Sequence, residues 1–209
     1  MISCVFSRHN SPIVIERPLN RIEFDDLLME YNTEEGPTAN VSVSVIITLN
    51  SARIYDDILR TSITMEQIWR DMRLSFKGVS EVPLPNSVRI WQPDTVILNA
   101  LSYDTKMTSL FLNFDGTIRK KQLLFVEVLC DESPNVTMKS DILECSLELT
   151  SFSNRGCEQI TYSVEKINND RIAQLRGRRL NAFLNLTKAE EKDVFRVNAI
   201  EDNLIDMIL

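Results

Sequence analysis

The feature that most constrains the fold of this chain is a polar loop with a cysteine at each end and an alternating apolar segment on each side. On the amino-terminal side, Leu124, Val126 and Val128 point to one face of an extended chain, because pleated strands have a side-chain period of two. The alternation resumes after Cys145. The pattern therefore predicts a strand, a closed loop and a second strand within residues 123–152.

Two of the four cysteines, Cys130 and Cys145, flank this loop. A disulfide between them would remove loop-closure entropy from the unfolded chain, worth about 3 kcal/mol in the chain-entropy model. Two unrelated buried thiols are the alternative, since free cysteine is among the most buried residue types. Cys4 and Cys157 would then be free or paired with each other. With no Cys-x-x-Cys pair and His9 as the only histidine, no metal site is predicted.

Composition limits the classes of function. The 209 residues suit one β domain or two small ones, and 44% hydrophobic residues suffice for a core. A net charge of −7 without a basic stripe argues against a nucleic-acid partner, because binding a phosphate backbone needs clustered positive charge. No apolar run is long enough to cross a bilayer, and no signal peptide is visible. We therefore expect a chain without a transmembrane segment, either processed or incomplete.

A short helix is predicted near the amino terminus. Within residues 20–31, the side chains of Phe24, Leu27, Leu28 and Tyr31 fall on one helical stripe, with acidic residues between them. Residue Asn20 can cap the amino end of this helix. We expect residues 1–19 to form an N-terminal extension and residues 20–209 to form one domain.

The rest of the chain has the period of strands. An Asp115-Gly116 dipeptide joins two of these segments, and it tolerates the positive φ angles of a type I′ hairpin turn. Strand candidates recur at roughly ten-residue spacing, which is the pattern of a sandwich. We predict an all-β, immunoglobulin-like β-sandwich of about ten strands with a short N-terminal α-helix. The clearest candidates are residues 41–49, 58–69, 107–114, 117–129, 159–166, 178–186 and 193–200.

Signals for catalysis are poor. His9 lies near the terminus, so a Ser/His/Asp or Cys/His arrangement has no convincing base. The phosphate-binding patterns GxxxxGK[ST] and GxGxxG are absent from the sequence. Neither an enzyme nor a cofactor is predicted.

Three fragments in a fixed order suggest a family. They are Trp69-Arg-Asp71-Met-Arg73-Leu74, Ile90-Trp91-Gln-Pro93-Asp94, and the cysteine loop with Asp141 four residues before Cys145. Together they resemble the extracellular domain of pentameric Cys-loop ligand-gated ion channels, over about residues 20 to 200. The resemblance implies a Cys130–Cys145 disulfide, a ring of five subunits, and structural roles for Trp69, Trp91 and Pro93. Phe152, where nicotinic subunits have tryptophan, makes the motifs more similar to the anion-channel branch.

The resemblance also implies a ligand site between neighbouring subunits. The residues at matching positions are Phe152, Leu98, Thr64, Glu66 and Leu112. Only Phe152 keeps an aromatic ring. Glu66 stands where amino-acid-gated channels have an arginine, so it would repel a carboxylate and favour a small cationic or amphipathic ligand. The alternative is that Glu66 is a strand residue facing solvent.

The tip of the cysteine loop, Met138-Lys139-Ser140, is polar and is similar to that of the soluble acetylcholine-binding proteins. Three sequons, at Asn40, Asn135 and Asn185, give weak support for glycosylation and secretion. We therefore expect a soluble, extracellular protein that forms homo- or hetero-pentamers and binds a small molecule at subunit interfaces. The alternative is a truncated or divergent subunit of an anion-type channel that assembles but has lost its ligand.

Overall fold

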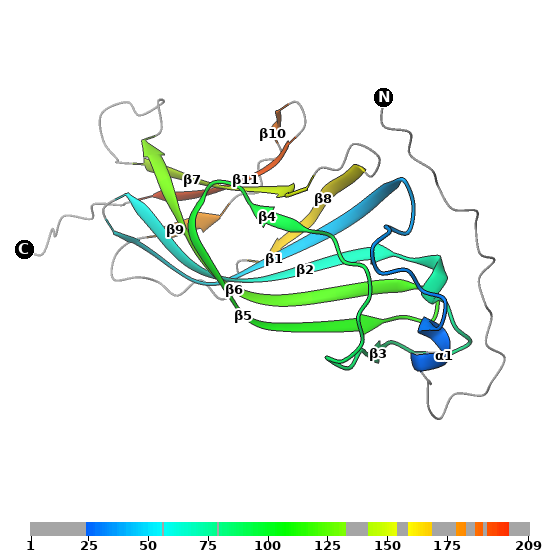
Figure 1. Cartoon of the computed structure of the whole chain (residues 1–209). Coiled ribbons are helices and arrows are strands. Elements are labelled where there is room, and N and C mark those ends of the chain that lie inside the picture. Colours follow the sequence, from blue (N-terminus) through cyan, green and yellow to red (C-terminus); the bar gives the residue numbers. More distant parts are fainter. Residues whose placement is uncertain are drawn as a thin grey trace, which may run out of the picture.

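The computed structural model describes residues 24–55, 57–78, 80–132, 142–153, 159–168, 179–182, 187–189 and 192–200. Eleven strands dominate these residues, with one short helix beside them (Figure 1). The elements are α1 (Phe24–Leu28), β1 (Asn40–Tyr55), β2 (Ile58–Arg70), the 3₁₀ turn η1 (Met72–Leu74), β3 (Val82–Pro83), β4 (Thr95–Ile97), β5 (Ala100–Leu112), β6 (Thr117–Glu132), β7 (Ile142–Ser151), β8 (Gln159–Asn168), β9 (Arg179–Ala182), β10 (Thr187–Ala189) and β11 (Lys192–Ile200).

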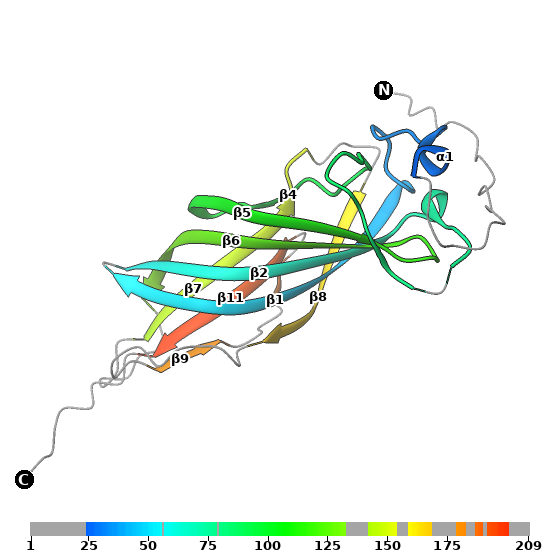
Figure 2. The same ribbon diagram turned by 90° about the horizontal axis from the view of Figure 1, so that it is seen from below.

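The strands are arranged in two layers that share one strand. In the first layer β8, β1, β2, β6 and β5 are neighbours, and β8 runs parallel to β1 while the other pairs are antiparallel. In the second layer β7 pairs with β4 and β11. Strand β6 leaves the first layer at its end, where Cys130–Glu132 pair with β7 (Figure 2). The predicted all-β, immunoglobulin-like architecture is confirmed.

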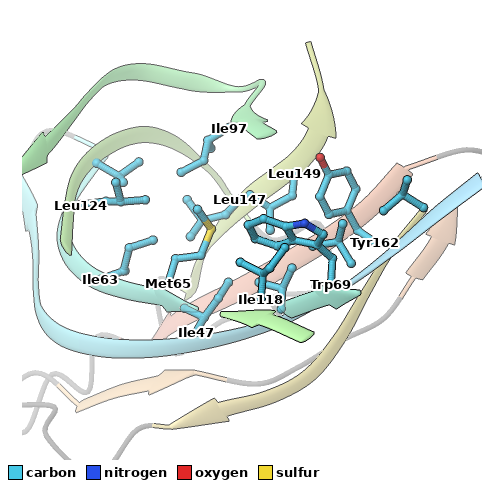
Figure 3. Packing of buried hydrophobic residues seen from close by; sticks show 14 of the residues in the cluster. Ile47, Ile63, Met65, Trp69, Ile97, Ile118, Leu124, Leu147, Leu149 and Tyr162 are labelled. Carbon is cyan, nitrogen blue, oxygen red and sulfur yellow. The ribbon is translucent and has the colours of Figure 1, made fainter. Parts of the chain in front are cut away.

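Alternation of side chains explains why these segments become strands with one buried face. On β2, Ile63 and Met65 are buried at 0% and 3% exposure. Thr64 and Glu66, which alternate with them along the strand, face away from the core. Figure 3 shows Ile63, Met65 and Leu124 of the first layer beside Leu147 of the second. Burial of these facing sets is what holds the two layers together.

The helix ends before Tyr31, the predicted limit of the 20–31 span. Within the described residues it ends at Leu28, and the amide of Tyr31 donates to the carbonyl of Leu28 at 3.1 Å to close the turn. Leu27 is buried, as the apolar stripe predicted. The predicted cap at Asn20 lies outside the described residues, and so does the boundary of the 1–19 extension.

The β5–β6 turn differs from the predicted type I′ turn. Among the residues of this turn only Gly116 has a positive φ, of 81°. The amide of Gly116 donates to the carbonyl of Asn113, and the side chain of Asp115 accepts from the amide of Thr117 at 3.0 Å. These bonds fit a type I turn followed by a left-handed glycine. A Cβ atom at Gly116 would lie 2.3 Å from the carbonyl oxygen of Asp71, so tertiary contact also requires glycine here.

A buried carboxylate ties α1 to the strands. Asp71 is 0% exposed and accepts hydrogen bonds from Arg73 Nε, Arg73 Nη2 and the hydroxyl of Tyr31. The Arg73 guanidinium also stacks on the Tyr31 ring at 4.5 Å. The hydroxyl of Tyr31 in turn accepts from the amide of Trp91 at 3.1 Å. Burial, with the negative charge of Asp71, raises the pKa of Tyr31 far above its usual range, so this hydroxyl keeps its proton.

The two tryptophans are part of the core, as predicted. Trp69 and Trp91 are 2% and 8% exposed, and their rings meet edge to face with centroids 6.4 Å apart. Pro93, which follows Trp91 by two residues, is also buried.

The predicted disulfide between Cys130 and Cys145 is present, with sulfurs 2.03 Å apart. It joins β6 to β7 where the two layers meet. The Cys4 and Cys157 positions lie outside the described residues. No helix of the described residues has the length and apolarity needed to cross a bilayer.

We expect the double variant Cys130→Ala/Cys145→Ala to lose about 3 kcal/mol of stability, because the unfolded chain regains its loop entropy. Urea unfolding at fixed temperature measures this loss, and non-reducing peptide mapping of the unmodified protein checks the bond. Recovery of the Cys130 peptide as a free thiol would contradict the pairing.

Replacing Tyr31 with phenylalanine should cost about 1–3 kcal/mol, because the buried Asp71 carboxylate and the Trp91 amide each lose a hydrogen-bond partner. Tyr103→Phe is the matched control, since Tyr103 is 49% exposed; it should change stability by less than about 0.5 kcal/mol. Equal unfolding midpoints for the two variants would show that the Asp71 cluster contributes little.

Candidate functional site

A hydrogen-bonded turn presents Phe152 at the end of β7. The carboxylate of Asp94 accepts hydrogen bonds from the hydroxyls of Ser151 and Ser153 and from the amide of Ser153, the last at 2.7 Å. The amide of Phe152 donates to the backbone carbonyl of Asp94 at 3.1 Å. With its backbone fixed in this way, the Phe152 side chain is 80% exposed. Asp94 therefore holds the shape of this turn, and the ring of Phe152 is exposed to a partner.

The environment of Asp94 keeps it ionised. Partial burial tends to raise the pKa of this carboxyl, but the hydrogen bonds from Ser151 and Ser153 outweigh burial and hold the pKa below its usual range. All of these donors come from the end of β7 or the residues just after it. The ionised carboxylate therefore serves to fasten β7 to the segment that leads into β4.

A chain of polar side chains crosses the core behind this turn. The hydroxyl of Thr95 donates to the side-chain oxygen of Gln67 at 2.7 Å and lies 2.8 Å from the hydroxyl of Tyr162. The side-chain amide of Gln67 donates to that of Gln122 at 3.3 Å. Burial raises the pKa of Tyr162 to about 12. These hydrogen bonds link β4 of the second layer to β8, β2 and β6 of the first layer.

The second predicted residue on this side, Leu98, is 52% exposed. Its amide donates to the carbonyl of Glu148 at 2.8 Å, whereas Phe152 bonds to Asp94 at the other end of the same strand pair. Four residues separate Asp94 from Leu98, which is roughly 13 Å along an extended strand. Leu98 directly follows β4 and Phe152 directly follows β7, so the two residues lie at opposite ends of this antiparallel strand pair and are not neighbours.

Glu66 and Thr64 lie on the other face of the chain, on the outward side of β2. The hydroxyl of Thr64 accepts a hydrogen bond from the side-chain amide of Asn50 at 2.9 Å. The carboxylate of Glu66 is paired with two cations of β6, with Lys121 Nζ at 2.9 Å and Arg119 Nη1 at 3.3 Å. Glu66 is therefore not an isolated carboxylate on a solvated surface.

The sequence reasoning missed Arg119 and Lys121. Arg119 also forms a two-bond contact with Glu81 and lies over the Phe111 ring at 4.4 Å. The signal was present in the alternation of β6, because its odd-numbered residues face outward with the even-numbered residues of β2. What the sequence lacked was the register that pairs Glu66 with Lys121.

The two cations determine the charge state of Glu66. Partial burial tends to raise its pKa, but the hydrogen bond and charge of Lys121, followed by those of Arg119, hold the pKa of Glu66 below its usual range. Glu66 and Glu81 together balance Arg119 and Lys121, so this patch carries little net charge. The idea that Glu66 alone attracts a cationic ligand does not fit this geometry.

Leu112 is placed differently from the other predicted site residues. Its side chain is 0% exposed and belongs to the core cluster. Within one chain it therefore has no surface to offer to a ligand. Leu112 is buried because the even-numbered positions at that end of β5 face the core.

The remaining predicted sites are surface features. Asn40 begins β1 and is exposed, while Asn135 and Asn185 lie outside the described residues. The residues that the structure describes contain no group of three or more His, Cys, Asp or Glu side chains arranged to hold a metal ion.

The fold is that of a neurotransmitter-receptor binding domain. Residues 21–207 match the family described as "Neurotransmitter-gated ion-channel ligand binding domain". The chain belongs to this family, which consists of binding domains of ligand-gated channels and not of enzymes.

Relatives with curated names support the same conclusion. The chain is 25% identical over 194 residues to "Acetylcholine receptor subunit alpha-like" of Manduca sexta, covering 86% of this chain and 36% of that protein. It is 30% identical over 145 residues to "Ligand-gated ion channel 50" of Caenorhabditis elegans, covering 62% of this chain and 29% of that protein. It is also 30% identical over 110 residues to "Acetylcholine receptor subunit alpha-like 2" of Drosophila melanogaster, covering 46% of this chain and 19% of that protein.

The chain thus spans about a third or less of the length of these relatives. Two of the three names are those of acetylcholine receptor subunits, whereas the motifs predicted kinship with the anion-channel branch. That kinship stays a prediction.

The lowered pKa of Glu66 gives a pH dependence with a definite sign. Because the folded-state pKa lies below the unfolded-state value, the stabilisation is complete above the unfolded value and is lost as pH falls through the folded value. We expect Glu66→Gln to flatten the acid side of the stability profile, measured by urea unfolding between about pH 3 and pH 7.

Glu127→Gln is the matched control for this experiment. Glu127 pairs with Arg60 at 3.0 Å, but both side chains are well exposed, at 38% and 58%. Exposed pairs contribute little, so this variant should keep the slope of the unmodified protein. An acid slope that is the same for Glu66→Gln and the unmodified protein would contradict the role of the two cations.

Proposed function

We propose that this chain is an extracellular ligand-binding protein that forms a ring of five subunits and binds a small molecule between neighbours. The observation that carries the proposal is the exposed ring of Phe152, fixed by the Asp94 turn in a chain that belongs to a neurotransmitter-binding family. Phe152 is the most exposed large hydrophobic side chain among the described residues.

The placement of the predicted residues supports assembly by unlike patches. A closed cyclic ring needs two different surfaces on each subunit, one of which meets the other on the neighbour. Phe152 and Leu98 flank the β4–β7 pair, and Thr64 and Glu66 lie on the outward face of β2 in the other layer. These residues do not meet within one chain, so a groove that uses both sets requires two subunits.

The ligand that suits this groove is a small cationic or amphipathic molecule. The face of an aromatic ring attracts a positive charge, with a contribution of about 0.5–2 kcal/mol. On the opposite face, Glu66 is already paired with Lys121 and Arg119, so it provides hydrogen-bond acceptors more than a free negative charge. Most of the selectivity for a cation therefore rests on Phe152.

The polar tip Met138-Lys139-Ser140 favours a soluble, secreted protein, because a polar tip needs no apolar membrane partner. The second candidate is the extracellular part of a channel subunit that assembles but no longer binds a ligand. The observation in its favour is that Phe152 is the only aromatic ring among the described predicted site residues, with Leu98 aliphatic and Leu112 buried.

Assembly and binding are tested together, with acetylcholine as the cationic probe. We expect native mass measurement to show a pentamer, and calorimetry to show binding that Phe152→Leu weakens by about 2- to 30-fold. Phe114→Leu is the matched control, because Phe114 is 43% exposed at the β5–β6 turn; it should bind as the unmodified protein does.

The outcomes separate the two candidates. A pentamer that binds neither acetylcholine nor a panel of small amines supports the subunit without a ligand. A monomer at all concentrations contradicts the ring, and equal affinities for Phe152→Leu and Phe114→Leu contradict the site.

A further inference from the structure

A cavity inside a single chain lies apart from the Phe152 turn. It has a volume of about 360 Å³, and most of its lining residues come from the segment that leads from β3 to β4 and from β5. Strand β3, where this segment begins, lies near α1 (Figure 1). The segment is held over the cavity by the amide of Leu84, which donates to the carbonyl of Leu110 at 2.9 Å. A second bond, from the amide of Val88 to the carbonyl of Pro85, folds the segment back on itself. A cavity of this size lies within the range of small-molecule sites.

The lining has an apolar floor and a polar mouth. Leu84 and Ile90 are 7% and 6% exposed and provide buried apolar walls, joined by the half-buried Leu110. Asn86 and Gln92 provide side-chain amides that can donate hydrogen bonds. Apolar walls with a few convergent polar groups are the usual composition of a site for a small organic molecule.

The charge of the lining indicates the class of ligand. Arg89 is the only charged residue among those that line the cavity, and no Asp or Glu lines it. Within the described part of the chain no carboxylate pairs with Arg89, whereas Arg73 and Arg119 are each paired. Arg89 is exposed, so its guanidinium is accessible to a ligand at the mouth of the cavity.

A second cation lies behind the wall of the cavity. Lys120 is opposite Leu110 in the β5–β6 register, and the even-numbered residues of β6 face the core, as the buried Ile118 and Leu124 show. Burial lowers the pKa of Lys120, and none of the described residues gives it a hydrogen bond or an ion pair. Lys120 is not among the residues that line the cavity, so Arg89 supplies the positive charge of the site.

We propose that this cavity is a second binding site, within each subunit, for a small amphipathic anion such as a short-chain carboxylate. The carboxylate would pair with the Arg89 guanidinium at the mouth through charge-assisted hydrogen bonds. The alkyl chain would lie against Leu84, Ile90 and Leu110. Because the cavity belongs to one chain, the site does not depend on the ring or on Phe152.

Titration of the full 209-residue chain with hexanoate, followed by saturation-transfer NMR, tests this site. We expect saturable binding of hexanoate and at least tenfold weaker binding of hexylammonium, which has the same tail and the opposite charge. Arg89→Gln should weaken hexanoate binding by about tenfold or more. Arg53→Gln, which removes one positive charge from an exposed position outside the cavity, should leave hexanoate binding unchanged.

A variant that fills the cavity provides a second test. Asn86→Trp places a large ring at the mouth from an exposed loop position, so it should abolish hexanoate binding without unfolding the chain, as checked by circular dichroism. Phe152→Leu should not affect hexanoate, which distinguishes this site from the one between subunits. Equal binding of hexanoate and hexylammonium, or hexanoate binding that survives both Arg89→Gln and Asn86→Trp, would overturn the proposal.

Discussion

The buried carboxylate of Asp71 is the interaction on which the α1 end of this domain depends. An ionised group at 0% exposure is stable only when it is fully paired, and removal of one partner of such a pair typically costs several kcal/mol. Its partners come from separate segments: Arg73 from η1 and Tyr31 from the residues after α1. Tyr31 also binds the amide of Trp91, and the carbonyl of Asp71 lies against Gly116. Folding must therefore bring Tyr31 to the turn that holds Asp71 and Arg73, and the segments of Trp91 and Gly116 pack against the same cluster.

The same constraint positions the candidate ligand surface. Trp91 is held in the core by the Trp69 ring and by Tyr31, and Asp94 follows three residues later. Asp94 then fastens the end of β7 through Ser151 and Ser153, which leaves the Phe152 ring outside. A binding residue on a turn is precise only when the turn is supported from behind. Here the support is the core itself, continued by the polar chain that begins at Thr95.

The electrostatics of the outward β2–β6 face and of the cavity differ in kind. On the β2–β6 face each cation has a carboxylate partner, so the patch is locked and close to neutral. At the cavity Arg89 has no such partner within the described residues, so a charge is left for a ligand to satisfy.

Local periodicity in the sequence determined the strands, the apolar stripe of the helix and the position of the cysteine loop, because a side chain's face follows from its place along one segment. The motifs around Trp69 and Trp91 were enough to indicate the family. Only the tertiary structure decided the partners of Glu66, the burial of Leu112 and the form of the turn at Gly116. Each of these depends on the register between strands that are distant in sequence, or on a backbone contact such as that of Gly116 with Asp71. A sequence pattern states which face a residue occupies, but the neighbouring strand determines what that face meets.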